Sequence, residues 1–197
     1  MNKFFAAAML TMFLLLSCGS IPETKIYSLN ITYENISQLQ GTADIVLGIL
    51  ATAPRHLSQP YLLIRNSPYE LTTEFYAKWE APPVRMISEA FRNALYDLKF
   101  FKDVRIVTAQ RVDFYCLKIN LRRFERFGES NTGVLEFDYD LLTNDGKNVL
   151  HGVYSKENPL PDNSFNSLAE GLSIALKDAL TQIVPQIKEK ILDKQKK

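Results

Sequence analysis

The chain has 197 residues, with 23 Lys and Arg against 22 Asp and Glu. This balance lacks the basic excess of a nucleic-acid-binding protein, and we expect no nucleic-acid partner. A chain of this length suits one domain that has its own hydrophobic core.

The first 17 residues have the features of a bacterial signal peptide. Lys3 supplies a positive charge, and residues 4–16 are apolar apart from Thr11. This run is shorter than the ~20 residues that a membrane-spanning helix needs, and no other stretch of the sequence is long and apolar enough to span a bilayer. The sequence therefore predicts a signal peptide over residues 1–17.

The signal segment ends in a sequence that resembles the lipobox of bacterial lipoproteins. Leu15-Leu16-Ser17-Cys18 places a branched residue three positions before the cysteine and a small residue directly before it. The resemblance implies cleavage before Cys18 and attachment of several acyl chains to Cys18, which hold a protein to a membrane better than one chain does. The alternative is an ordinary secretory signal that leaves Cys18 as a free thiol, although the stretch lacks the Ala-x-Ala-like site of that signal.

The segment after the lipobox is expected to hold the folded part of the protein at a distance from the membrane. Residues 19–41 are rich in polar and turn residues, and their only compact apolar island is residues 26–29. Such a composition is typical of a linker. We therefore predict a lipidated N-terminus and tether over residues 18–41 and a single domain over residues 42–197.

The first half of the domain begins with segments that have the composition of strands. Residues 44–50 form a nearly continuous apolar run rich in branched residues, which is typical of a buried central strand. A proline-containing loop over residues 53–60 follows. Residues 61–65 and 71–76 then predict two short strands separated by a turn.

Two amphipathic helices are predicted, one in the middle of the domain and one at its end. The first begins at Pro82-Pro83, since proline suits the first turn of a helix. The second opens with a capping-box pattern from Ser167 to Glu170, and Pro185 is expected to kink it or to end its first part. The apolar positions at helical spacing are Ile87, Phe91, Leu95 and Leu98 in the first helix and Leu168, Leu172, Leu176, Ala179, Ile183, Ile187 and Ile191 in the second.

Between the helices, three further segments have the pattern of strands. They cover residues 114–124, 134–142 and 149–155, and we expect them to form an antiparallel meander. The order of strands and helices in one small chain predicts an α+β fold. Its sheet is expected to be mainly antiparallel, with the two amphipathic helices packed on one face.

A row of carboxylates marks one side of the second of these strands. Glu136, Asp138 and Asp140 alternate with apolar residues, which indicates a sheet with one solvent-facing side. An acidic site is one interpretation of this row. We favour a solvated face whose charge is balanced by Arg122 and Arg123 on the neighbouring strand.

The sequence does not contain a recognisable catalytic motif. It lacks a Gly-x-Ser-x-Gly elbow, a His-Glu-x-x-His pair, a Cys-x-x-Cys pair and a phosphate-binding glycine loop. The two histidines, His56 and His151, have no close-spaced ligand partners in sequence. Cys116 lies in a strand-like run and is expected to pack as a small residue, and with Cys18 lipidated it has no disulfide partner. We therefore expect no catalytic residue, no metal and no cofactor.

Short motifs spread over most of the mature chain resemble those of a known family. They are Tyr27-Ser28-Leu29, residues 54–60 leading into Ile64-Arg65, residues 75–82 before the first helix, Arg123-Phe124-Glu125, and residues 172–180 in the last helix. None of them is specific alone. Together, their order and spacing resemble the ABC-type transport auxiliary lipoproteins, a PqiC-like family associated with lipid transport by MCE proteins.

The resemblance implies a non-catalytic accessory lipoprotein of an ABC system for lipid transport across the periplasm. It implies an MCE-domain protein as partner and leaves room for a homo-oligomer, with the membrane contacted through the lipid anchor. Gly19 after the cysteine agrees with sorting to the periplasmic side of the outer membrane. The alternatives from other classes are a structural or assembly lipoprotein similar to the plug of the lipopolysaccharide translocon, and a lipoprotein enzyme.

Within the family-like motifs, several residues are candidates for either partner binding or a structural role. Prolines stiffen the loop before the first short strand. Arginine and tryptophan are enriched in binding hot spots, but both also serve as structural anchors. The candidates are Tyr27, Leu29, Pro54, Leu57, Arg65, Trp79 and Phe124, and the lipid anchor is Cys18.

The substitution Cys18→Ala is expected to leave an uncleaved precursor at the inner membrane, because the peptidase that matures lipoproteins requires the modified cysteine. The measurement is gel mobility after cells have been fed radiolabelled palmitate. The native protein should carry label, whereas the variant should be larger and unlabelled. Maturation of the variant to the native size would contradict lipidation.

Overall fold

The structure, a computed structural model, describes residues 22–32 and 42–195 of the chain. The predicted signal peptide and Cys18 lie outside the described residues, as do parts of the predicted tether. In chain order, the elements are β1 (Lys25–Tyr27), β2 (Ala43–Thr52), the 3-10 helix η1 (Arg55–Ser58), β3 (Tyr61–Ser67), β4 (Glu70–Trp79), α2 (Pro83–Asp97), β5 (Phe101–Ile106), β6 (Tyr115–Phe127), β7 (Thr132–Leu142), β8 (Asn148–Pro159) and α3 (Phe165–Gln195).

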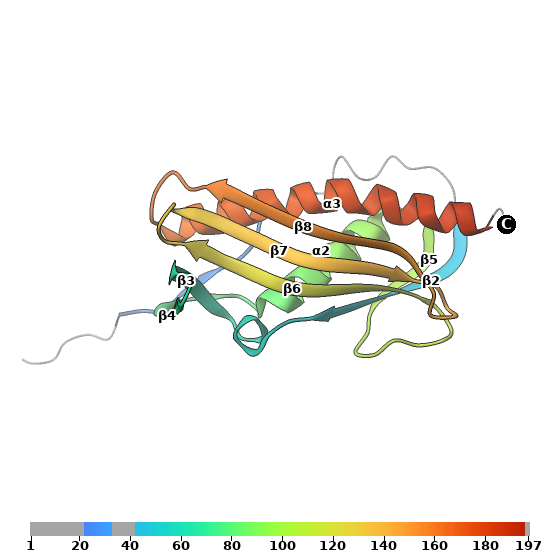
Figure 1. Cartoon of the computed structure of the whole chain (residues 1–197), viewed down its shortest axis with the longest axis horizontal. Helices are drawn as coiled ribbons and strands as arrows, with labels where there is room; N and C mark the ends of the chain where they lie inside the picture. Colours follow the sequence, from blue (N-terminus) through green and yellow to red (C-terminus); the bar gives the residue numbers. More distant parts are fainter. Residues whose placement is uncertain (1–21, 33–41, 196–197) are drawn as a thin grey trace, which may run out of the picture.

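One eight-stranded mixed sheet is the frame of the domain (Figure 1). β6 pairs with β7 along most of its length, and β7 pairs with β8, so these three long strands form an antiparallel meander. The other edge of β6 is shared, because β2 pairs in parallel with residues 115–120 and β3 with residues 126–127. β5 extends the sheet beyond β2, and β4 and β1 extend it beyond β3. The strands β1, β4 and β3 are referred to below as the small sheet.

The α+β class is confirmed, but the sheet is mixed rather than mainly antiparallel. The expected meander and the β3–β4 hairpin are antiparallel, whereas β1–β4, β2–β5, β2–β6 and β3–β6 are parallel pairs. Two parallel neighbouring strands need a long crossover connection between them. For β2 and β5, this connection includes α2, which directly precedes β5. The sequence-based expectation also missed β5, because Lys102, Asp103 and Arg105 obscure its apolar pattern.

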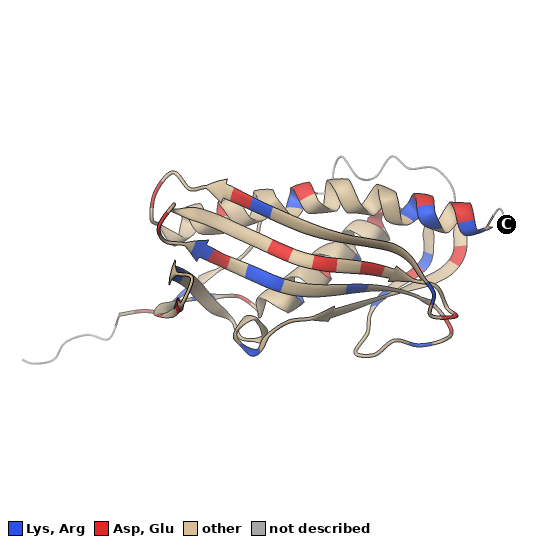
Figure 2. Cartoon of the chain, in the orientation of Figure 1, with Lys and Arg blue, Asp and Glu red and all other residues tan. Residues whose placement is uncertain are grey.

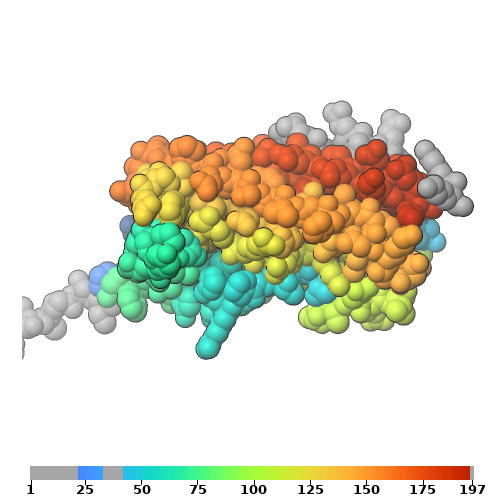
Figure 3. Space-filling view, viewed as in Figure 1, coloured from blue at the N-terminus to red at the C-terminus, as the bar shows by residue number. Residues whose placement is uncertain are grey.

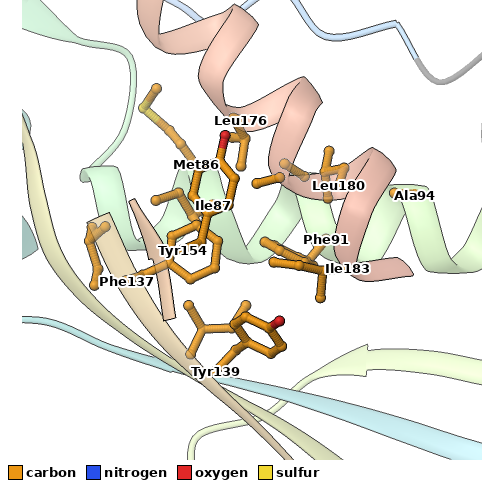
Figure 4. Close-up of a cluster of buried hydrophobic side chains, with 14 of the residues drawn as sticks. Met86, Ile87, Phe91, Ala94, Phe137, Tyr139, Tyr154, Leu176, Leu180 and Ile183 are labelled. Carbon is orange, nitrogen blue, oxygen red and sulfur yellow. The ribbon is translucent and has the colours of Figure 1, made fainter. Parts of the chain in front are cut away.

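Both helices lie behind the sheet in Figure 1, and they meet side chains of β7 and β8 in one buried cluster (Figure 4). The ring of Phe137 in β7 lies edge-on to Phe91 of α2, at 5.8 Å between centroids, and stacks on Tyr154 of β8 at 5.3 Å. The Tyr154 hydroxyl donates a hydrogen bond to the carbonyl oxygen of Ala175 in α3 at 2.7 Å. Aromatic pairs contribute about 0.5–1.5 kcal/mol each beyond their burial, so this cluster ties the sheet to both helices.

Both predicted helices form, but the last one begins earlier than its expected capping box. α2 begins at Pro83, directly after Pro82, as the paired prolines predicted. α3 begins at Phe165, and the Ser164 hydroxyl oxygen accepts a hydrogen bond from the Ser167 backbone N–H at 3.1 Å. Ser164 is therefore the N-cap, three residues before the serine that the sequence indicated.

The second helix does not end at Pro185, because α3 continues to Gln195. A proline inside a helix removes one backbone hydrogen bond and costs about 3 kcal/mol or more. Val184 and Ile187, on either side of it, are fully buried in the core. Burial of this apolar face stabilises the helix across the proline, since tertiary packing supplies most helical stability in proteins.

The segment after the predicted lipid anchor differs from the expected tether. Lys25–Tyr27 forms β1, which pairs in parallel with the end of β4. Leu29 and Ile31 pack against the core, and the Asn30 backbone N–H donates a hydrogen bond to the Ser173 hydroxyl oxygen at 3.1 Å. Residues 22–32 therefore lie along the domain, because their apolar side chains find partners on the sheet and on α3.

The pKa of Asp162, which precedes α3, is lowered to about 2 by hydrogen bonds from Ser164 and Ser167. The charged carboxylate thus stabilises the start of the helix above its unfolded pKa of about 3.9, and this contribution is lost as the pH falls toward about 2. Asp162→Asn is expected to lower the melting temperature at neutral pH, by a difference that shrinks as the pH falls below about 4. Thermal melts from neutral to acidic pH, with Glu129→Gln as an exposed-carboxylate control, test this. A difference that stays constant over the range would contradict the role of Asp162.

Candidate functional site

Two of the motif residues, Trp79 and Phe124, pack together in the core. Trp79 ends β4 and is only 2% exposed, and its ring lies edge-on to Phe124 of β6 at 5.2 Å between centroids. Phe124 is fully buried. Both side chains lie where the small sheet meets β6, so in this chain neither ring is accessible to a partner.

The other apolar motif residues also contact the domain itself. Tyr27 of β1 lies edge-on to Phe165, the first residue of α3, at 5.8 Å between ring centroids. Leu29 packs against the core, and Leu57 of η1 is fully buried. Pro54 precedes η1, and its carbonyl oxygen accepts a hydrogen bond from the Leu57 backbone N–H at 3.0 Å. These residues hold the N-terminal segment and the loop before β3 in place.

Arg65, the charged motif residue, is paired with a buried carboxylate. Its Nε lies 2.6 Å from Oε1 of Glu125 and its Nη2 lies 3.1 Å from Oε2, so the contact is bidentate. The Nε of Arg123 donates a third hydrogen bond to Oε1 at 2.7 Å. Glu125 is 1% exposed, and its hydrogen bond raises the pKa of Arg65. A buried charge is tolerated only when it is well paired, and here the pairing joins β3 to β6.

The carboxylate row on β7 lies on a charged side of the meander (Figure 2). Nη2 of Arg122 lies 2.6 Å from Oδ2 of Asp138, and its Nη1 lies 3.6 Å from Oε1 of Glu136. The expectation that Arg123 also balances the carboxylate row is wrong, since the Nε of Arg123 contacts Glu125. The cause is an irregularity of β6 between Leu121 and Arg123 that shifts the register against β7.

The third member of the row, Asp140, has different partners. Its Oδ1 accepts a hydrogen bond from Nδ2 of Asn148 at 2.7 Å and lies 2.8 Å from Nδ1 of His151. Both partners belong to β8, which pairs directly with β7. The row is therefore a surface on which each carboxylate has polar or charged partners on a neighbouring strand, as we expected of a sheet face balanced across strands.

The remaining reactive side chains do not converge. Among residues 22–32 and 42–195, no group of three or more His, Cys, Asp and Glu side chains is arranged to hold a metal ion. Cys116 is fully buried, and this burial raises the pKa of its thiol, which disfavours the nucleophilic thiolate. None of the helices in the described part of the chain is long and apolar enough to span a membrane.

Several shallow grooves lie on the surface of the described residues, and two of them are large enough to matter for partner contacts. One, of about 460 Å³, lies between residues 28–32 and α3 and includes Ser173 and Lys177 in its lining. The other, of about 580 Å³, lies between the end of β2, the start of α2 and the end of β5, and is lined in part by Leu50 and Ile106. Their mixed apolar and polar linings suit contacts with another surface more than the binding of a small ligand.

Sequence reasoning missed a group of exposed apolar side chains on the small sheet. Two of them, Phe75 and Tyr76, lie where β4 bulges between the residues that pair with Leu63 and Tyr61. The adjacent aromatic pair Phe75-Tyr76 was the available signal, since neighbours in a regular strand point to opposite faces and a strand at the edge cannot bury both. The exposed side chains are Ile26, Tyr61, Phe75 and Tyr76.

The sequence matches a known protein family, and the fold is similar to that of solved structures. Residues 27–184 match the family described as "ABC-type transport auxiliary lipoprotein component". The crystal structure of protein XCC0632 from Xanthomonas campestris is similar, with a TM-score of 0.75 and 19% sequence identity over 88% of this chain and 100% of that chain. A crystal structure of an uncharacterized protein has a TM-score of 0.62 and 11% identity over 86% of this chain and 99% of that chain. No curated protein matches the sequence.

The family match thus assigns this α+β domain to the auxiliary components of transport systems. The chain belongs to the ABC-type transport auxiliary lipoprotein family, because the match covers most of its length. The family resemblance predicted from the short motifs is confirmed. Membership in this family identifies the protein as a lipoprotein of a transport system.

The ion pair of Arg65 and Glu125 is expected to show strong energetic coupling. Arg65→Met should lower the free energy of unfolding by about 1.5–3 kcal/mol, less than the full cost of an unpaired buried charge, because Arg123 still contacts Glu125. Glu125→Met should also destabilise the fold. The double variant should lose less than the sum, with a coupling energy on the order of 1–3 kcal/mol measured by urea unfolding.

The matched control for this cycle is the exposed pair Arg85 and Glu89 on α2, whose Nε and Oε1 atoms lie 2.8 Å apart. An exposed pair four residues apart in a helix should couple by only about 0.3–0.5 kcal/mol. Equal coupling in the two pairs would show that burial of Glu125 does not strengthen its contacts.

Proposed function

We propose that this protein is a non-catalytic accessory lipoprotein of an MCE-protein/ABC system for lipid transport across the periplasm. It is anchored through Cys18 to the periplasmic side of the outer membrane. The observation that carries the proposal is the match of residues 27–184 to the transport auxiliary lipoprotein family. Gly19 after the lipidated cysteine supports the outer membrane as the location.

The positions of the motif residues support a role through surface contacts. Trp79, Phe124 and Leu57 are buried, and Arg65 is paired with Glu125, so these residues maintain the shape of the domain. Partner contacts are therefore assigned to exposed features, among them the groove beside α3 and the groove at the end of β5.

Binding to the MCE-domain protein is the central requirement of this proposal. A homo-oligomer of the domain is part of it, because a ring of identical subunits can cap the end of a channel through head-to-tail contacts. The domain is expected to act there by position and contact, with the ATPase and permease supplying the energy and the passage for lipid.

The full-length lipidated protein, purified in detergent, is expected to co-purify with an MCE-domain protein of the same organism. Its size, measured by light scattering alone and with that partner, should exceed that of a monomer. Ile106→Glu places a charge in the groove at the end of β5 and tests that groove as the contact, with Val112→Glu as the exposed control elsewhere.

Three outcomes would contradict the proposal. A protein that never binds the MCE-domain partner but co-purifies with an outer-membrane assembly protein would favour the structural or assembly role. A monomer that hydrolyses an ester or glycan would favour an enzyme. Retention in the inner membrane would remove the proposed location.

A further inference from the structure

The distance between the proposed lipid anchor and the folded domain is short. β1 begins at Lys25, so the chain from Cys18 to the sheet comprises only residues 19–24 between them. A fully extended chain spans at most ~3.3–3.6 Å per residue, so the Cα atom of Lys25 lies within about 25 Å of that of Cys18. The edge of the sheet at β1 is therefore held close to the membrane that takes the acyl chains.

The exposed apolar side chains lie on this edge of the sheet. Ile26 of β1 and Tyr61 of β3 are both register partners of Lys78 on β4, so the three residues form one row across the small sheet. Phe75 and Tyr76 lie in the bulge of β4 that precedes Lys78. Ile26 is 71% exposed and Phe75 is 80% exposed. Ile26, Tyr61, Phe75 and Tyr76 are referred to below as the aromatic patch.

The patch and the start of the described chain occupy the same end of the molecule. In Figure 3 the blue residues of the N-terminal segment adjoin the green residues near the end of β4 at the left of the view. The loop between β5 and β6, which contains Val112, lies at the opposite end of the sheet in Figure 1. A lipid anchor before β1 therefore brings the patch, and not that loop, to the membrane.

We propose that the aromatic patch inserts into the headgroup interface of the membrane that holds the lipid anchor, so that lipid and patch together fix the orientation of the domain. This rests on the proposed lipidation of Cys18. Tyrosine is enriched at membrane interfaces, where its ring meets the acyl boundary and its hydroxyl stays in water. Lys78, between Ile26 and Tyr61, can extend its amine to the headgroups.

The charges around the patch decide what kind of membrane contact this is. Lys25 and Lys78 are accompanied by Glu23 and Glu74, so the region carries no basic excess. Attraction to anionic lipid requires a cluster of basic residues. The contact therefore comes from apolar and aromatic area, and it is expected to form on neutral phosphatidylcholine and to persist at high salt.

The test uses the full-length lipidated protein in phosphatidylcholine vesicles whose acyl chains carry bromine, which quenches indole fluorescence on contact. Phe75→Trp puts an indole in the patch, and Val112→Trp puts one in the exposed control loop. The native protein supplies the baseline emission of Trp79, which is buried. Brominated lipid is expected to abolish much of the added emission of Phe75→Trp and to leave that of Val112→Trp unchanged.

A longer tether distinguishes a patch that binds the membrane from one that is only held near it by the lipid anchor. A flexible insert of about 20 Gly and Ser residues after Pro22 adds about 25 Å of average reach. Quenching of Phe75→Trp that persists with the insert supports the proposal. Quenching that disappears with the insert, that is absent while the protein floats with vesicles, or that is equal at both positions overturns it.

Two further measurements, the accessibility of the indole in detergent and flotation with vesicles, show why quenching would be absent. In detergent without vesicles, a Phe75→Trp indole that is protected from dissolved iodide and also unquenched by brominated detergent would place a second copy of the chain on the patch and overturn membrane insertion. A chain that carries no lipid and does not float overturns both the anchor and the patch. A chain that floats and binds its MCE-domain partner without quenching overturns the patch alone and leaves the proposed function in place.

Discussion

The structure depends on one shared edge, that of β6, where two different strands must join the same neighbour. β2 takes the first half of this edge and β3 takes only its last two pairs, so hydrogen bonds alone connect the small sheet weakly. The buried carboxylate of Glu125 strengthens the junction, because Arg65 of β3 contacts it with two nitrogen atoms. On the core side, the ring of Trp79 on β4 packs against Phe124 on β6 and adds an apolar contact between the small sheet and β6.

This constraint explains why the motif residues are poor candidates for direct partner contacts. A buried ion pair contributes little net stability compared with apolar packing, but removal of one partner is costly. Its consequence here is geometric, since it fixes the angle and position of the small sheet on the meander. A transport accessory that works by contact needs a defined surface, and the buried motif provides the rigidity behind that surface.

The N-terminal segment is the part of this architecture that lies nearest in sequence to the proposed lipid anchor. β1 adds to the free edge of β4, and Leu29 and Ile31 continue along the core. The small sheet is therefore the part of the domain that the proposed anchor would hold, while the meander and α3 extend away from β1 (Figure 1). Under the proposed function, a domain held in this way would present one defined side to the membrane and another to its partner.

The sequence by itself determined the α+β class, both helices, the meander and the family, because these follow from local periodicity and from short motifs. It also predicted that Arg122 balances the acidic row. That contact joins two strands that are adjacent in the chain, so it could be inferred from local sequence. Only the tertiary structure decided that the sheet is mixed, that residues 25–27 belong to it, and that Arg123 and Arg65 meet at Glu125. Arg65 and Glu125 are 60 positions apart in the chain, and the parallel pairs likewise join strands that are distant in sequence. No periodic pattern records such contacts, nor does it record a local irregularity such as that of β6.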